Sequence, residues 1–245
     1  MTEQPIVVYT CIAGKYDKHL MPVEPVPGVR FVCFTDSTGY LKASGWEIMP
    51  LASPARLTSG HDINRYHKFF PHRILPDTKW SIYIDGNIRF AGDWHAMIAR
   101  VRDADAGLGM FWHPDGHNLA TEIAACNRYD KFDDRDRTMI DSQIAFYARH
   151  GIDQGLPIPT NNVIVRDHAA SGLELGMSLW WSQLFEFTKR DQISLPFVLR
   201  QSGLCWQPLD GEGGIDRALL QVVWHRPPLR TRIRKRLRRQ FGIKG

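Results

Sequence analysis

Asp85 and Asn87 flank a glycine in the run Asp85-Gly86-Asn87, so a carboxylate and an amide stand two positions apart. Both side chains offer oxygen ligands of the kind that Mg²⁺ and Mn²⁺ prefer, and these ions often keep open positions for substrate phosphates. A cation bound there would neutralise a diphosphate leaving group. The same three residues also form ordinary turns. On their own, they indicate a metal site no more strongly than a simple turn.

The hydrophobic pattern places this run at the end of a strand, because residues 80–84 form a short apolar segment directly before Asp85. Asp62 is the expected N-cap of the helix that precedes this strand. Alternating strands and helices predict an α/β fold with a mainly parallel sheet and ligands beyond the carboxyl ends of its strands. Further strands are predicted at 5–12, 29–34, 46–51, 88–90, 107–112 and 162–165, and helices at 62–75, 93–101, 118–127, 133–150, 168–187 and 191–201.

Length and composition favour one large domain. The 245 residues are 43% hydrophobic, enough for a well-filled core, and they include no Ser/Gly linker, repeat or low-complexity tract. The four cysteines are far apart without a CxxC pair, which predicts buried thiols in a reducing compartment. The sequence shows neither a signal-peptide pattern nor an apolar run of about 18 residues. We therefore expect a cytoplasmic protein.

The positive charge of the chain is concentrated in its last residues. Residues 230–245 carry eight Lys or Arg and no acid; the whole chain has 31 basic and 26 acidic residues, which leaves 23 basic and 26 acidic residues elsewhere. We therefore separate a domain, 1–228, from a basic tail, 229–245. Leu229, Ile233, Leu237 and Phe241 recur every four residues, and as a helix this tail would suit an anionic membrane surface. A solubilising tail is the alternative, and nucleic-acid binding is not expected.

Six sequence blocks, in order over roughly residues 6 to 200, resemble the GT-A glycosyltransferases. The resemblance is greater to a glycosyltransferase-like family of bacteria and plants, whose plant members are linked to seed-mucilage and pectin synthesis. It extends more distantly to the retaining, glycogenin-like glycosyltransferases. It implies a single domain of the GT-A (Rossmann-like) fold that transfers a sugar from a nucleotide-sugar. The blocks are Tyr9–Asp17, Phe31–Asp36, Arg65–His72, Ser81–Ile88, Asn161–Arg166 and Arg190–Gln192.

The resemblance also implies where the nucleotide-sugar would bind. Arg65 and Lys68 lie three apart on one predicted helical face, from which cations could reach the diphosphate, although a solvated face is the alternative. Asp36 also has an alternative, as a turn acid. The implied donor-site residues are Thr10, Ala13 and Tyr16 at the nucleotide, Asp36 near its base or ribose, and Arg65, Lys68 and Asp85 at the diphosphate.

Three late residues resemble those around the anomeric carbon and the acceptor in retaining enzymes: Asn162, Asp191 and Gln192. Asp191 could orient or deprotonate an acceptor hydroxyl or, with Gln192, stabilise positive charge on the sugar. Its ordinary alternative is a helix N-cap. His225 resembles a late histidine that completes metal coordination, and a structural histidine is its alternative.

The run at residue 85 departs from the common GT-A metal motif, which has acids at both outer positions. Asn87 brings no charge, so a direct bond from Asn87 to the metal and one through water both stay open. His113 and Glu122 flank the expected acceptor side.

These residues predict a metal-dependent glycosyltransferase that uses Mn²⁺ or Mg²⁺. The expected donor is a UDP-sugar, the acceptor a glycan or glycolipid, and the stereochemistry retaining. A cytoplasmic enzyme of this kind could lie peripherally on the inner face of the membrane. The alternatives are a metal-dependent hydrolase of a lipid or glycan, whose usual dense His/Asp cluster is missing, and a non-catalytic carbohydrate-binding protein, which the eight Trp would allow.

Overall fold

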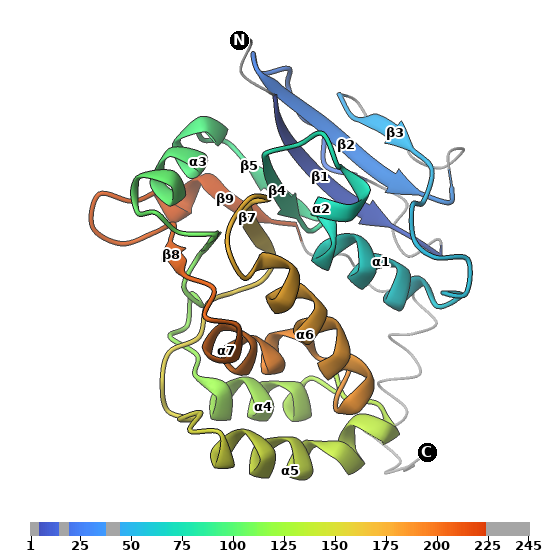
Figure 1. Ribbon diagram of the computed structural model, residues 1–245, viewed down its shortest axis with the longest axis vertical. Coiled ribbons are helices and arrows are strands. Elements are labelled where there is room, and N and C mark those ends of the chain that lie inside the picture. The colour runs from blue at the N-terminus through green and yellow to red at the C-terminus, as the bar shows by residue number, and fades with distance from the viewer. Residues whose placement is uncertain (1–4, 15–19, 38–44, 224–245) are drawn as a thin grey trace.

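A seven-stranded sheet organises the protein, for which a computed structural model describes residues 5–14, 20–37 and 45–223 (Figure 1). Its strand order is β3-β2-β1-β4-β7-β6-β8. Neighbouring strands are parallel except that β7 runs antiparallel to both β4 and β6. The predicted α/β class with a mainly parallel sheet is therefore confirmed. The strand bounds are β1 Ile6–Ile12, β2 Val29–Thr35, β3 Glu47–Met49, β4 Trp80–Ile84, β6 Leu108–Met110, β7 Val163–Asp167 and β8 Trp206–Pro208.

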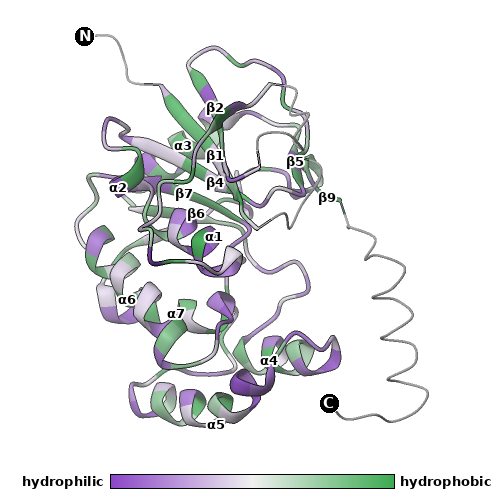
Figure 2. Cartoon of the chain, turned by 90° about the vertical axis from the view of Figure 1, so that its right-hand side faces the viewer, coloured by the Kyte–Doolittle hydropathy of each residue, from purple (hydrophilic) through white to green (hydrophobic). Residues whose placement is uncertain are grey.

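Helices cover both faces of the sheet. In Figure 1, α4 to α7 form a layer below the sheet and α3 lies at its upper edge. Alternate residues of β1 point to opposite faces, as the strand period requires: Val7 and Tyr9 join the cluster that includes α6 and α7, whereas Ile6 and Val8 pack with α3. Figure 2 shows the matching hydrophobic colour along the central strands. The helix bounds are α1 Gly60–Phe69, α2 Pro71–Ile74, α3 Trp94–Asp103, α4 Leu119–Arg128, α5 Asp134–Arg149, α6 Leu173–Glu186 and α7 Asp191–Ser202.

The helix predicted over 62–75 is divided in two. Phe70 adopts non-helical angles between α1 and α2. Pro71 follows it, and a proline disfavours the helical conformation of the residue before it, which explains the break. The expected N-cap was wrong: Ser59 caps α1 by accepting a hydrogen bond from the backbone N–H of Asp62, which lies within the first turn.

A second, two-stranded sheet brings the end of the described chain back to β4. Strand β5 (Ile88–Phe90) pairs antiparallel with β9 (Leu220–Val222), which follows the 3-10 turn η1 (Arg217–Leu219). The sequence analysis did not predict β8 or β9, which have three residues each. Residues 224–245 lie outside the described residues, so the membrane-binding tail stays a prediction.

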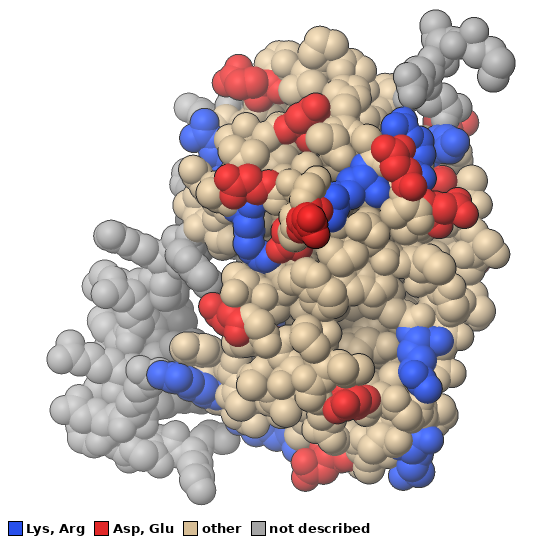
Figure 3. All heavy atoms as spheres, turned by 90° about the vertical axis from the view of Figure 1, so that its left-hand side faces the viewer, with Lys and Arg blue, Asp and Glu red and all other residues tan. Residues whose placement is uncertain are grey.

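Two further expectations concern the described parts of the chain. Cys11, Cys33 and Cys126 are buried free thiols as predicted, but Cys205 is exposed. Among the described residues, no helix is long and apolar enough to cross a membrane. On the face drawn in Figure 3, acidic and basic side chains alternate instead of separating by sign. That face therefore presents no extended basic surface for a polyanion.

Candidate functional site

The turn at Asp85 lies directly beyond the carboxyl end of β4. The backbone N–H of Asp85 donates to the carbonyl of Asn162 at 2.9 Å, and Ile88 donates to the carbonyl of Asp85 at 2.9 Å, which closes the turn. A side chain at Gly86 would be crowded, since a Cβ there would lie 3.3 Å from the end of Ile12. Glycine thus allows the turn to pack against β1 with both outer side chains at the surface of the site.

Tyr83, near the end of β4, holds the Asp85 carboxylate in the turn that follows. The Tyr83 hydroxyl donates to Oδ1 of Asp85 at 2.8 Å. Burial and the charge of Asp85 raise the pKa of Tyr83 well above its usual value. The hydroxyl therefore remains protonated and continues to donate. One carboxylate oxygen is fixed in this way, and the Asp85 residue lines the cavity described below.

Asn87 is fixed by the returning end of the chain. Its Nδ2 donates to the carbonyl of Val223 at 3.3 Å, and the Val223 N–H donates to the Asn87 carbonyl at 2.9 Å. With the amide nitrogen engaged, the side-chain oxygen is the atom available to a ligand. Asp85 and Asn87 together offer hard oxygen atoms, which fit Mg²⁺ or Mn²⁺.

A cavity of about 450 Å³ opens beside this turn. It is lined by the ends of β1 and β4, by the first half of α1 and by Arg190. Asn64 of α1 joins two of these walls, because its amide donates to the carbonyl of Cys11 at 2.7 Å and its oxygen accepts from Arg65 at 2.7 Å. Arg65 and Arg190 thus bring positive charge into a cavity that contains the Asp85 carboxylate.

Lys68 does not line this cavity. Its side chain is buried, and Nζ lies 2.8 Å from Oδ2 of Asp191. Burial lowers the pKa of Lys68, and the charge of Asp191 opposes that shift. The shared helical face of Arg65 and Lys68 is therefore present, but it faces a buried carboxylate. The expectation that Lys68 reaches a diphosphate does not fit this placement, because the ammonium group is enclosed in an ion pair.

Asp191 is buried behind Arg65, which lines the cavity. It is only 2% exposed, and Arg65 Nε lies 3.1 Å from the same Oδ2 that binds Lys68. Burial favours the neutral acid, but the charges of Arg65 and Lys68 outweigh it and lower the pKa of Asp191. Asp191 is the first residue of α7 and Arg190 is the capping position, so the N-cap alternative was wrong. Asp191 therefore positions Arg65 at the cavity wall.

Asn162 and Gln192 connect the start of β7 to α7. Gln192 accepts a hydrogen bond from the Asn161 N–H at 3.1 Å and donates to the carbonyl of Pro159, so both ends of its amide are used by the backbone. The Asn162 side chain accepts from the Thr160 hydroxyl at 2.9 Å, and its carbonyl accepts from Asp85. Both residues are thus beside the Asp85 turn, and their catalytic roles stay predictions.

Only some of the residues expected at the nucleotide lie at the cavity. Ala13 lines the cavity, but Thr10 is fully buried in β1 and does not. Asp36 lies at the next strand end, where its Oδ2 accepts a hydrogen bond from the Gly14 N–H at 3.0 Å. This places Asp36 beside the loop that edges the cavity. Tyr16 and His225 lie outside the described residues.

Comparison with known proteins assigns the chain to a family. The sequence pattern described as TOD1/MUCI70, glycosyltransferase-like domain, matches residues 46–204. The chain belongs to the TOD1/MUCI70 glycosyltransferase-like family. The matched residues include the Asp85 turn, Arg65, Arg190 and Asp191, and therefore most of the cavity. The predicted resemblance to a plant and bacterial glycosyltransferase-like family is confirmed.

Two curated relatives come from Arabidopsis thaliana. The chain is 28% identical over 150 residues to a protein named probable hexosyltransferase MUCI70, covering 58% of this chain and 25% of that protein. It is 28% identical over 170 residues to a protein named alkaline ceramidase TOD1, covering 64% and 36%. The chain therefore spans between a quarter and just over a third of the length of these relatives. Mouse xyloside xylosyltransferase 1 gives a structural match with a TM-score of 0.47 at 11% identity, over 84% of each chain.

Sequence reasoning did not single out Tyr83 or Arg190, which both line the cavity. For Tyr83, its position two residues before Asp85 was a usable signal. Arg190 belongs to a block that supported the family resemblance, but its place at the cavity and at the start of α7 depends on the packing of α7, which the sequence pattern does not define.

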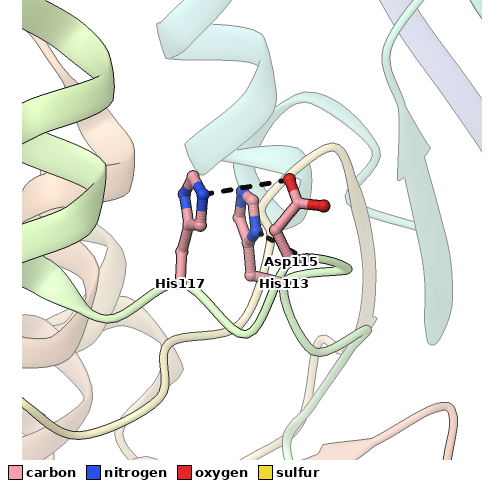
Figure 4. A group of neighbouring side chains, drawn as sticks. All are labelled: His113, Asp115 and His117. Carbon is pink, nitrogen blue, oxygen red and sulfur yellow. Dashed lines mark hydrogen bonds and ion pairs between the residues drawn. The ribbon is translucent and has the colours of Figure 1, made fainter.

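A histidine cluster lies on the loop after β6. His113, Asp115 and His117 bring possible ligand atoms within 4.8 Å of one another, and Figure 4 shows the three side chains side by side. Glu122 of α4 lies beneath the two imidazoles, 3.3 Å from His117 Nδ1 and 4.0 Å from His113 Nε2. His113 and Glu122, expected on the acceptor side, thus form one group with two residues that the sequence analysis had not singled out.

Proposed function

We propose that this protein transfers a sugar from a nucleotide-sugar, with UDP as the nucleotide, to a glycan or glycolipid in a reaction that depends on Mn²⁺ or Mg²⁺. One juxtaposition carries the proposal: hard oxygen ligands and two arginines line the same cavity, at the strand ends where α/β sheets bind ligands. Membership of a glycosyltransferase-like family and the name of the MUCI70 relative support it.

The residues of the cavity would have separate roles in binding the nucleotide-sugar donor. Asp85 and Asn87 would hold the divalent cation, whose charge stabilises the diphosphate leaving group. Arg65 and Arg190 would donate charge-assisted hydrogen bonds to phosphate oxygens. Tyr83 keeps Asp85 oriented through its 2.8 Å hydrogen bond. His225 is proposed as a further ligand, because it follows by two residues the Val223 backbone that binds Asn87.

The environment of Asp191 supports a retaining reaction. An inverting transferase needs a general base whose pKa lies near the working pH. Asp191 is buried, paired with two cations, and has a lowered pKa, so it is a poor base. We propose that it acts by positioning Arg65.

Lipid hydrolysis is the second candidate, because one relative is named an alkaline ceramidase. Both functions would use the same family domain, but their products differ. Incubation with UDP-sugars and with ceramide in parallel separates them. Release of UDP with transfer of the sugar supports the first, and release of a fatty acid from ceramide without sugar transfer supports the second. Binding of a sugar without either product would favour the non-catalytic alternative.

Calorimetry with UDP tests the donor proposal directly. We expect UDP to bind in the presence of Mn²⁺ and to bind much more weakly after the metal is removed with EDTA, because the metal joins the diphosphate to Asp85. A folded protein, verified by circular dichroism, that binds UDP equally well with and without Mn²⁺ would contradict metal dependence. A folded protein that binds no UDP in either condition would overturn the donor assignment.

Replacing Arg190 with alanine should weaken UDP binding. A hydrogen bond to a charged group contributes about 1.5–3 kcal/mol, which corresponds to a loss of roughly 10- to 150-fold in affinity. Titration of Arg190→Ala with UDP and Mn²⁺ measures this loss. Arg149→Ala removes an exposed arginine at the end of α5 and is the matched control, with unchanged affinity expected. Equal affinities for the two variants would remove Arg190 from the donor site.

A further inference from the structure

The histidine cluster is built by a tight loop whose two ends are anchored. The Gly116 N–H donates to the His113 carbonyl at 3.0 Å, and Gly116 has a φ of +61°, a left-handed conformation that glycine adopts without cost. His113 donates to the carbonyl of Ile158 at 3.1 Å, and the Ile158 N–H donates to the carbonyl of His117 at 3.0 Å. The backbone thereby brings the two imidazoles together, stacked with centroids 3.9 Å apart and planes within 5°.

Glu122 orients both rings from below. It is 4% exposed, and its Oε2 faces His117 Nδ1 at 3.3 Å and His113 Nε2 at 4.0 Å. Its Oε1 accepts from the thiol of Cys126, whose pKa burial raises to about 11, so the thiol stays protonated. A buried carboxylate in this position favours an N–H on each facing ring nitrogen. Metal-binding histidines commonly donate their second nitrogen to a carboxylate in this way.

The opposite ring nitrogens face Asp115. His117 Nε2 lies 3.8 Å from the Asp115 carboxylate, and His113 Nδ1 accepts a long hydrogen bond, 3.4 Å, from the Asp115 N–H (Figure 4). Nδ1 of His113 therefore carries a lone pair on this side. Asp115 is exposed, so the Asp115 side of the cluster is open to solvent.

We propose that His113, Asp115 and His117 form a second metal site, selective for a late first-row transition metal such as Zn²⁺, with Glu122 as the positioning residue. Two imidazole nitrogens and one carboxylate leave a fourth position open for water or another ligand. Tetrahedral Zn–N bonds of about 2.0–2.1 Å place ligand atoms roughly 3.3 Å apart. The candidate ligand atoms lie within 4.8 Å of one another, and His117 Nε2 is 3.8 Å from the Asp115 carboxylate. Side-chain rotations would bring them to bonding distance, and the metal would replace the Asp115 N–H at His113 Nδ1.

This site differs chemically from the one proposed at Asp85. Asp85 and Asn87 offer only oxygen, which suits Mg²⁺ or Mn²⁺, whereas nitrogen ligands favour Zn²⁺. The two sites share an edge of the sheet, because β4 and β6 both run antiparallel to β7 and so end at the same side. Strands β4 and β6 are two strand spacings apart, on the order of 10 Å, and each site lies on the segment that follows its strand. The inference does not depend on the activity of the cavity.

Zinc calorimetry on the full chain tests the inference, with circular dichroism confirming that each variant is folded. We expect saturable Zn²⁺ binding that His113→Ala and His117→Ala each reduce at least about tenfold. Asp115→Asn, a change at an exposed position, should also reduce the affinity. Glu122→Gln should weaken Zn²⁺ binding by roughly 10- to 100-fold, as expected for a group that orients a ligand. A wild-type chain that binds no Zn²⁺ would overturn the inference.

Two variants distinguish this site from other places where zinc could bind. His95→Ala removes an exposed histidine whose ring bonds to the carbonyl of Pro27, and it should bind Zn²⁺ like the wild type. Asp85→Asn should also keep Zn²⁺ binding while losing Mn²⁺-dependent UDP binding. The inference is overturned if Asp85→Asn or His95→Ala removes Zn²⁺ binding, or if Asp115→Asn and the two cluster alanine variants retain it unchanged.

Discussion

Asp85→Asn is expected to reduce sugar transfer on the order of 10²–10³-fold, the loss typical of removing one group that stabilises charge in a transition state. The substitution keeps the size of the side chain and can still accept the Tyr83 hydrogen bond. It removes the one negative charge that the turn offers to a cation, since Asn87 is neutral. Metal-dependent UDP binding should fall together with activity, and both are measured by calorimetry and by release of UDP.

The matched control for this change is Asp77→Asn. Asp77 is exposed on the loop before β4, at the opposite end of that strand from Asp85. The control should keep full activity and UDP affinity. Thermal unfolding should give similar midpoints for both variants, because neither replaces a buried charge. An Asp85→Asn protein with normal metal-dependent UDP binding would show that the cation, if one binds, is held elsewhere.

The position of Asp85 was predictable because its signal is local. The apolar run 80–84 coincides with β4, and a polar run after a buried strand lies at the sheet edge where ligands bind. Local sequence also predicted the bounds of α3, α4, α5 and α7 to within a few residues. The signals were polar residues at the helix starts and apolar residues repeating at helical spacing. These signals were sufficient for the fold class and for placing Asp85 at the edge of the sheet.

The other parts of the site depend on contacts between distant residues. The ion pair between Lys68 and Asp191 joins positions 123 residues apart, and the bond from Asn87 to Val223 spans 136. Hydrophobic periodicity carries no information about such pairs. The expectations for Lys68 at the phosphates and Asp191 at the acceptor came from the family resemblance, which does not indicate that these two side chains pair. The antiparallel direction of β7 was missed for the same reason. A strand has the same period of two whichever way it runs.

The histidine cluster was only partly predictable from the local sequence. His113-Pro-Asp-Gly-His117 has strong turn chemistry, which predicts that the two histidines approach each other. That signal was available, and only His113 was singled out. The buried carboxylate of Glu122 beneath the rings requires the packing of α4, which the sequence did not supply. Turn chemistry can therefore indicate a cluster, but its orienting residue comes from the tertiary structure.

Asp191→Asn is expected to destabilise the fold by about 3–5 kcal/mol at pH 7, because it leaves two cations without their buried counter-charge. The side chains of Lys68 and Arg65 are 2% and 16% exposed, so water cannot replace the carboxylate at Lys68. Urea unfolding of the wild type and the variant measures the difference. Asp62→Asn is the control on α1, because Lys189, the partner of Asp62, is 33% exposed and the loss should stay within about 1 kcal/mol.

The pH dependence of this difference follows from the lowered pKa of Asp191. A carboxyl group whose pKa is lower in the folded state stabilises the fold above its unfolded pKa of about 3.9, and that stabilisation is lost as the pH falls further through the folded value. The gap between wild type and Asp191→Asn should therefore be constant near neutrality and narrow below about pH 4. A gap that widens on acidification would contradict the ion-pair explanation.

A double-mutant cycle separates the ion pair from general effects of replacing Asp191. In a Lys68→Met background, Asp191→Asn should lower the free energy of unfolding by less than it does in the wild type. The ion pair between Lys68 and Asp191 is already absent there, so the substitution removes only the contact between Arg65 and Asp191. UDP affinity provides the second measurement. Asp191→Asn should also weaken UDP binding, since Asp191 holds Arg65 at the cavity wall, whereas Lys68→Met should affect stability more than affinity. Equal costs in both backgrounds would mean that Lys68 and Asp191 are not coupled.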